Sequence, residues 1–188
     1  MLARKGQRAV KLDELTALFR SISAKARGLV TALDVIVWAV DPKDNSLESV
    51  ADYLSDFTAE YFSHSQITCR FDIPVALPFT LLDGRLRHGL LVAVKETLNN
   101  VERHSQATEV EFRITCADDQ LLIIISDNGT GFDTGKKQGG HGLRNLPLRL
   151  SQLGGRYTIE SAIGKGTIVT ISLRLAPLAE TVPVNQEG

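Results

Sequence analysis

The feature that most constrains the fold is an apolar run, Leu121 to Ile125, that leads directly into a carboxylate and two glycines. Consecutive aliphatic residues of this kind predict a buried β-strand. Residues 127–131 follow with the sequence Asp-Asn-Gly-Thr-Gly. Glycine allows positive φ angles and a close approach of backbone to ligand, and a carboxylate at a strand end can accept a hydrogen bond from a ligand N–H. The same sequence is also an ordinary turn signal. Residues 127–131 can therefore form either a plain turn or part of a ligand site, and both interpretations remain open at this point.

The composition is that of an ordinary globular protein, with 43% hydrophobic and 23% charged residues in a chain of 188. A net charge of −1 gives no general electrostatic attraction to nucleic acid or to a membrane surface. No run approaches the roughly 20 apolar residues of a membrane span. Cys69 and Cys116 fit no metal-binding spacing and suit a reducing interior. We therefore expect a cytoplasmic segment that contacts neither nucleic acid nor membrane.

The N-terminal part, residues 11–40, has apolar residues at spacings of three and four, which predicts one long helix. Such a helix would be roughly 45 Å long at ~1.5 Å per residue. It can lie on its own domain or form one arm of an intermolecular bundle, and its length favours the bundle. Pro42 ends this pattern. At the other end of the chain, residues 177–188 read as a tail.

Between these ends the sequence alternates helical and strand patterns, and Ser46 offers a helix N-cap. The expected helices are 47–64, Asp83–His104 and Leu143–Leu153, and the expected strands are Ile67–Ile73, Glu109–Cys116, Gln120–Ser126, Arg156–Ser161 and Thr167–Leu175. Hairpins mixed with helices predict an α+β fold, a two-layer α/β sandwich with helices on one face of a mixed, mostly antiparallel sheet.

The helix Asp83–His104 carries polar residues that core packing does not require. Glu96, Asn100, Arg103 and His104 recur at helical spacing on or near one face. An amide oxygen suits Mg²⁺, a guanidinium suits phosphate, and a carboxylate can orient or deprotonate water. The alternative is a solvated helix face that carries an intrahelical ion pair. The sequence of this helix, taken alone, slightly favours the alternative.

Two further glycine-rich segments follow. Residues 139–143, Gly-Gly-His-Gly-Leu, open a helix, and backbone N–H groups at a helix N-terminus bind phosphate well. Residues 164–167, Gly-Lys-Gly-Thr, read either as a hairpin turn or as the support of a Thr167 hydroxyl beside a site. Neither segment matches the common phosphate-loop or dinucleotide-binding spacings.

In this order the segments resemble the catalytic ATP-binding domain of sensor histidine kinases in the NarL/DesK-like branch. The resemblance covers about Ser46 to Leu175 and implies the Bergerat ATP-binding fold shared with gyrase, Hsp90 and MutL. Residues 96–105 look like the N box, 127–131 like the G1 box, 140–145 like the G2 box, and 164–167 like the final glycine-threonine element. One departure is Pro147, which stands where relatives carry an ordinary helix former and where a deep position would kink the helix.

The resemblance implies ATP and Mg²⁺ as cofactors, with Asn100 on the metal, Asp127 on the adenine amino group and Glu96 as the catalytic residue. Arg103 would meet the phosphates, and His104 would lie near the base or ribose. The full set of implied nucleotide-binding residues is Asn100, Arg103, His104, Asp127, Gly129, Gly131, Gly140, His141, Gly142, Leu143 and Thr167.

By the same resemblance, residues 1–42 are part of a dimerisation and phosphotransfer bundle helix, 43–176 the ATPase domain and 177–188 the tail. The phosphoacceptor histidine of this branch is followed by an acidic residue, whereas the histidines here precede Ser65, Gly89, Ser105 and Gly142. The acceptor is therefore expected outside this chain.

The implied function is transfer of the ATP γ-phosphate to that histidine and then to a response regulator protein. The full-length kinase would be a homodimer through the N-terminal helix, and this segment the cytoplasmic portion of a membrane-anchored sensor. Two alternatives stay open: a nucleotide-sensing interaction module without kinase activity, and a serine kinase of the anti-sigma type.

Overall fold

The computed structural model describes residues 38, 45–135 and 141–175. In chain order the elements are α2 (Leu47–Phe62), β1 (Thr68–Asp72), α3 (Gly84–Asn100), the π-helical turn η1 (Val101–Ser105), β2 (Glu109–Ala117), β3 (Gln120–Asp127), α4 (His141–Gln152), β4 (Gly155–Ser161) and β5 (Thr167–Arg174). This order is the predicted one. Apart from Trp38, which is helical, the expected helix over residues 11–40 and the tail 177–188 lie outside the described residues.

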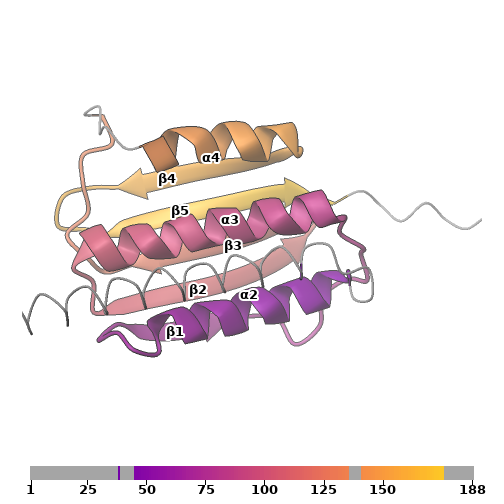
Figure 1. Ribbon diagram of the computed structural model, residues 1–188, viewed down its shortest axis with the longest axis horizontal. Helices are drawn as coiled ribbons and strands as arrows, with labels where there is room; N and C mark the ends of the chain where they lie inside the picture. The colour runs from indigo at the N-terminus through magenta and orange to yellow at the C-terminus, as the bar shows by residue number, and fades with distance from the viewer. Residues whose placement is uncertain (1–37, 39–44, 136–140, 176–188) are drawn as a thin grey trace, which may run out of the picture. The chain divides into compact units, whose positions relative to one another are not determined.

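The five strands form one sheet in the order β1-β2-β3-β5-β4. Strands β1 and β2 pair in parallel, and the other three pairs are antiparallel. Helices α2, α3 and α4 all lie on the same face of this sheet (Figure 1). The predicted α+β class, with helices layered on one face of a mostly antiparallel sheet, is confirmed.

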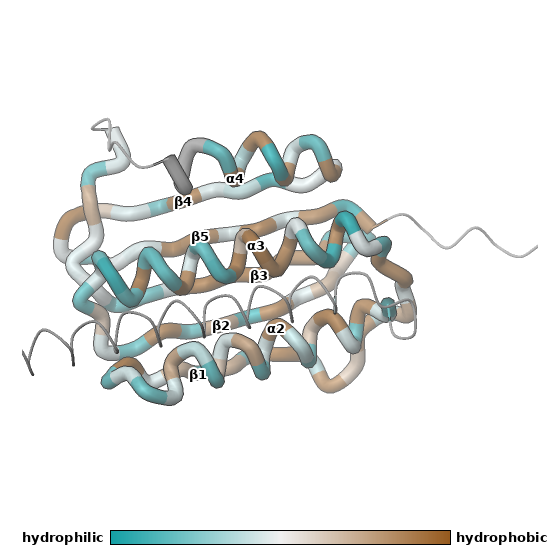
Figure 2. Tube along the Cα trace, in the orientation of Figure 1, coloured by the Kyte–Doolittle hydropathy of each residue, from teal (hydrophilic) through white to brown (hydrophobic). Residues whose placement is uncertain are grey.

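The core lies between these two layers. On β3, Leu121, Ile123 and Ile125 are buried, whereas Leu122 and Ile124 are only half-buried. The predicted strand is therefore present and is fully buried on one face only, because successive side chains of a strand point to opposite faces and helices cover only one of them. Figure 2 shows hydrophobic residues along β3 and β5 and on the segments of α3 that face them.

Side-chain caps fix where two helices begin. The Ser46 hydroxyl accepts from the backbone N–H of Ser49 (3.2 Å) at the start of α2, as predicted. The Asp83 carboxylate accepts from the N–H of Leu86 (2.8 Å) at the start of α3. Each cap satisfies a backbone donor that a helix start leaves without an intrahelical partner.

Helix α4 begins at His141, earlier than the predicted start at Leu143. Pro147 therefore lies inside the helix and beyond its first turn, where it has no N–H to donate to the carbonyl of Leu143. Gly154 follows the helix with φ of +76°, the left-handed conformation that commonly ends a helix.

The helix predicted to run to His104 instead changes geometry after Asn100. Residues Val101–Ser105 form a π-helical turn, which closes with Gln106 in the left-handed region at φ of 55°. A π-turn is wider than an α-turn, so the regular spacing of the preceding helix changes at this point. Turns of this kind often mark functional positions in helices.

Candidate functional site

A pocket lies where η1 and the end of α3 meet the ends of β3, β4 and β5. Most of its walls are aliphatic or aromatic, with a few polar groups among them. Its lining residues are Thr97, Asn100, Val101, His104, Ser105, Ile125, Asp127, Gly131, Phe132, Tyr157, Ile159, Thr167 and Val169. An apolar pocket with a few placed polar groups is the usual form of a small-molecule site.

Strand register builds the polar wall of this pocket. Asp127 has the same parity along β3 as Ile123 and Ile125, so its side chain faces the helices. On the neighbouring strands Asp127 pairs with Thr167, and Thr167 pairs with Ser161. The Ser161 and Thr167 hydroxyl oxygens are 3.1 Å apart. One cross-strand row therefore brings a carboxylate and two hydroxyls to the same end of the sheet.

The Asp127 carboxylate is buried, with 7% of its surface exposed. Its Oδ1 accepts a hydrogen bond from the N–H of Gly129 at 2.8 Å. Burial raises the pKa of this carboxyl, and hydrogen bonds from Gly129 and from Thr167 partly offset the rise. An ionised carboxylate offers about four acceptor positions, so Asp127 can still accept from a ligand N–H in the pocket.

The glycine turn after Asp127 packs closely against two segments, the end of η1 and the turn between β4 and β5. A Cβ on Gly129 would overlap the carbonyl oxygen of Ser105, and one on Gly131, whose φ is +59°, would overlap that of Ala162. Between them, the N–H of Thr130 donates to the Ser105 carbonyl at 2.7 Å. The turn therefore needs both glycines for close packing, and Gly131 also lines the pocket.

Asn128, in the middle of the same turn, points away from the pocket. Its Oδ1 accepts from the N–H groups of Thr108 (2.9 Å) and Glu109 (3.0 Å), and its Nδ2 donates to the Thr108 hydroxyl. Asn128 thus fastens the end of β3 to the start of β2. Asn128 therefore supports the turn interpretation of this segment, whereas Asp127 and Gly131 line the pocket and their contact with a ligand remains a prediction.

On the helical side, the structure brings Asn100 and His104 to the pocket. Glu96 is half-buried and Arg103 exposed, and neither lines the pocket. The four residues predicted to share one face therefore divide into two groups, with Asn100 and His104 at the pocket and Glu96 and Arg103 away from it. The roles of all four remain predictions.

The phosphate-binding segment is described only in part. Gly140 lies outside the described residues. His141, Gly142 and Leu143 form the first backbone turn of α4, where free N–H groups are available for an anion. Their contact with phosphate remains a prediction.

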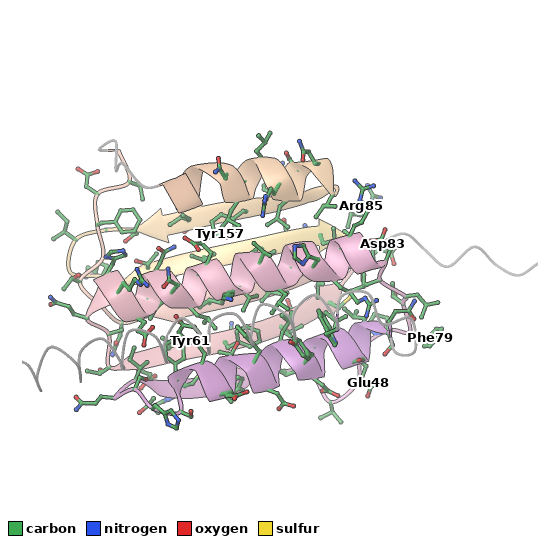
Figure 3. The ribbon with its side chains drawn as sticks, in the orientation of Figure 1. Glu48, Tyr61, Phe79, Asp83, Arg85 and Tyr157 are labelled. Atoms are coloured by element: carbon green, nitrogen blue, oxygen red, sulfur yellow. The ribbon has the colours of Figure 1, made fainter. Side chains whose placement is uncertain are left out.

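Sequence reasoning missed several pocket residues, among them Thr97, Phe132 and Tyr157. The Tyr157 hydroxyl, on β4, lies 3.0 Å from the Thr97 hydroxyl, which also donates to the Ala93 carbonyl (Figure 3). Burial raises the pKa of Tyr157. Tyr157 and Ile159 are two residues apart on β4 and therefore face the same side of the sheet. The β4 sequence could have predicted that Tyr157 faces the pocket only if the inner face of the strand had been known.

Ser161 was also missed, and it links the two loops beside the pocket. Its hydroxyl oxygen accepts from the N–H of Phe132 (2.9 Å), and the hydroxyl donates to the carbonyl of Gly166 (2.8 Å). Ser161 therefore holds the segment after the glycine turn against the β4–β5 turn. A serine at the end of a strand carries no distinct sequence signal for such a role.

The π-turn η1 is held from both sides. The Ser105 carbonyl accepts from Thr130 on one side. On the other, the Tyr61 hydroxyl of α2 donates to Glu102 at 2.9 Å. The Tyr61 ring packs edge-on against Phe62, with centroids 5.3 Å apart. These contacts fix the turn that presents Asn100 and His104 to the pocket.

We expect Tyr61→Phe to loosen η1 with little loss of global stability, because the hydrogen bond to Glu102 is largely exposed. Hydrogen exchange of the η1 amides should quicken, and nucleotide affinity should fall by about threefold. Glu102→Gln keeps an acceptor oxygen and serves as the conservative control. The positioning role is wrong if exchange in η1 is unchanged by Tyr61→Phe, or if Glu102→Gln affects it equally.

Among the described residues, no group of three or more His, Cys, Asp or Glu side chains could hold a metal ion. Mg²⁺ binds with one or two protein oxygens when substrate phosphates supply further ligands. The Asn100 amide on the pocket wall fits that mode. No helix in the described part of the chain is long and apolar enough to cross a membrane.

Taken together, the fold and the pocket define an α+β domain with a small-molecule pocket around a buried carboxylate. Residues 86–177 match the family model described as "Histidine kinase-, DNA gyrase B-, and HSP90-like ATPase". Residues 86–177 thus form a domain of this ATPase family, and the relatives reported next include a sensor protein and a histidine-protein kinase/phosphatase.

Two curated relatives and one solved structure illustrate the match. The chain is 32% identical over 114 residues to the nitrate/nitrite sensor protein NarQ of Escherichia coli, covering 60% of this chain and 20% of NarQ. It is 36% identical over 94 residues to the histidine-protein kinase/phosphatase UhpB of Salmonella typhimurium, covering 50% of this chain and 18% of UhpB. The histidine kinase domain of the blue-light activated kinase EL346 of Erythrobacter litoralis superposes with a TM-score of 0.62 at 18% identity, over 85% of this chain and 83% of that one. The chain thus spans about a fifth of the two curated relatives.

Proposed function

We propose that this chain is the ATP-binding catalytic part of a two-component sensor histidine kinase. It binds ATP with Mg²⁺ and transfers the γ-phosphate to a histidine outside this chain, from which a response regulator receives it. The membership in the ATPase family and the similarity to sensor kinases support this proposal. The full-length protein is then a homodimer through its N-terminal helix and a membrane-anchored sensor with this part in the cytoplasm.

The observation that carries the proposal is a buried carboxylate in a mostly apolar pocket. Asp127 stands beside Thr167 with the walls of Ile125 and Val169 around it. Such a pocket suits a flat heterocycle that presents an exocyclic amino group, and adenine is one. The carboxylate accepts from the amino group while the apolar walls cover the ring faces.

The remaining groups divide the polar part of the nucleotide between them. Asn100 contributes an amide oxygen to Mg²⁺, and His104 lies near the ribose. The first turn of α4 and Arg103 bind the phosphates, and Glu96 positions the reacting γ-phosphoryl group. Phosphoryl transfer depends mainly on such positioning and on neutralising charge, and Mg²⁺ supplies charge neutralisation when bound.

A transfer experiment tests this function directly. The chain is mixed with γ-labelled ATP, Mg²⁺ and the histidine-bearing bundle of a related kinase. We expect label on the bundle in an acid-labile, base-stable form, as for a phosphorylated histidine, and none without the chain. Nucleotide binding without any transfer would support a sensing module in place of a kinase. Failure to bind nucleotide would overturn both functions.

A further inference from the structure

A second concave surface lies at the other end of α3, away from the pocket around Asp127. It runs between the first half of α3 and the last turns of α4, with Gly89 and Leu150 among its lining residues. In Figure 3 Arg85 marks this end of α3, while Tyr157 lies toward the opposite end of the sheet. Its cavity volume is about 260 Å³, well above the roughly 10–15 Å³ that a single water needs.

The floor of this groove is apolar, and a glycine shapes it. Leu150 is fully buried beneath it. A Cβ on Gly89 would overlap the Cδ1 atom of Leu153, so the absence of a side chain there lets Leu153 pack directly against α3. The groove runs beside this contact, since Gly89 and Leu153 both line it.

The rim of the groove carries two arginines and a histidine. Arg85 and His88 come from α3 and Arg149 from α4, and all three are exposed. None of them has an ion-pair partner among the described residues, and no carboxylate of those residues lines the groove. The nearby Asp83 carboxylate is engaged by the N–H of Leu86 at the helix start. The groove therefore combines an apolar floor with a positive rim.

We propose that this groove, formed by α3 and the C-terminal half of α4, is a docking site for an acidic segment of a partner protein that inserts an apolar side chain. Charge complementarity selects the occupant: carboxylates of the partner meet Arg85 and Arg149, and its apolar side chain covers the floor at Leu150. Opposite charges at such a rim speed association and select the partner, while the apolar anchor supplies most of the affinity. The site is separate from the nucleotide pocket and does not depend on the proposed kinase function.

Titration of the isotope-labelled chain by NMR tests this docking site. The probe is a short synthetic peptide that alternates Leu with Glu and Asp, and a matched peptide carries Lys at every acidic position. We expect the acidic peptide to shift the amide signals of Gly89, Leu150 and Leu153, with binding weakened by added salt. The Lys peptide should leave these signals unchanged.

Charge-reversal variants sharpen the test. Arg85→Glu combined with Arg149→Glu should weaken binding of the acidic peptide by about tenfold or more. Arg174→Glu, a change at an exposed arginine at the end of β5, should leave it unchanged. Equal binding by the double variant would overturn the proposal, as would shifts by the Lys peptide. The proposal is also wrong if the groove signals respond to vesicles of anionic lipid or to self-association of the chain and not to the acidic peptide.

Discussion

Replacing Asp127 by Asn should lower the affinity for ATP by about 10- to 150-fold, the effect of losing one hydrogen bond to a charged acceptor (about 1.5–3 kcal/mol). The variant side chain has the same shape, and its remaining oxygen can still accept from the N–H of Gly129. Its new NH₂ group, however, is a donor that can face the donor amino group of adenine. Calorimetric titration with ATP and Mg²⁺ measures the loss.

The same variant should keep or gain stability. Burial raises the pKa of Asp127, so the folded chain binds this proton more tightly than the unfolded chain does. The contribution of Asp127 to stability is therefore fully present below its unfolded pKa and is lost as pH rises through the folded value. At neutral pH the ionised carboxylate costs folding free energy, and Asp127→Asn removes that cost. Urea unfolding at neutral pH should give an equal or larger free energy of unfolding.

Asp118→Asn is the matched control, because Asp118 lies in the turn between β2 and β3 with φ of 51°, which Asn tolerates well. Its ATP affinity should equal that of the original chain. If Asp127→Asn lowers the free energy of unfolding by as much as it lowers the free energy of ATP binding, the carboxylate has a structural role. Unchanged affinity would mean that adenine binds elsewhere.

The second large effect is expected from Gly131→Ala. The added Cβ would overlap the carbonyl oxygens of Ala162 and Gly166, and the positive φ of +59° is itself unfavourable for alanine. We expect the free energy of unfolding to fall by about 2–4 kcal/mol. ATP affinity should also fall, because Gly131 lines the pocket and the two loops cannot both keep their positions.

Gly164→Ala separates the two causes of that effect. Gly164 also has a positive φ, +76°, but a Cβ there would meet nothing within 4 Å. In Gly164→Ala the free energy of unfolding should fall only by the conformational cost of a positive φ, about 1–2 kcal/mol. The ATP affinity of this variant should be unchanged. If both variants lose the same free energy of unfolding in urea, the close packing of Gly131 against the β4–β5 turn contributes nothing.

The sequence predicted the order of elements because each signal was local. Strand runs and the cap at Ser46 act within a few residues, and all are present in the structure. The inward position of Asp127 could also be predicted, because strand periodicity alone puts Asp127 on the same face as Ile125.

Other features depend on contacts between distant segments. The π-turn after Asn100 is held by Tyr61 and Thr130, which lie far from it in sequence, so a helical spacing rule could not anticipate it. Tyr157 reaches the pocket, and Ser161 the loops beside it, only through the pairing of β4 with β5. Residues of this kind are visible only once the sheet register is known.

Nucleotide selectivity tests the central claim most directly. Inosine triphosphate differs from ATP in carrying a carbonyl oxygen in place of the amino group that we expect to face Asp127. Titration of the chain with each nucleotide and Mg²⁺ should show ATP binding at least about tenfold more tightly, because the carbonyl would set an acceptor against a carboxylate. Asp127→Asn should narrow this difference, since its NH₂ group can donate to the carbonyl. Equal affinities of the original chain for the two nucleotides would contradict the assignment of adenine to Asp127.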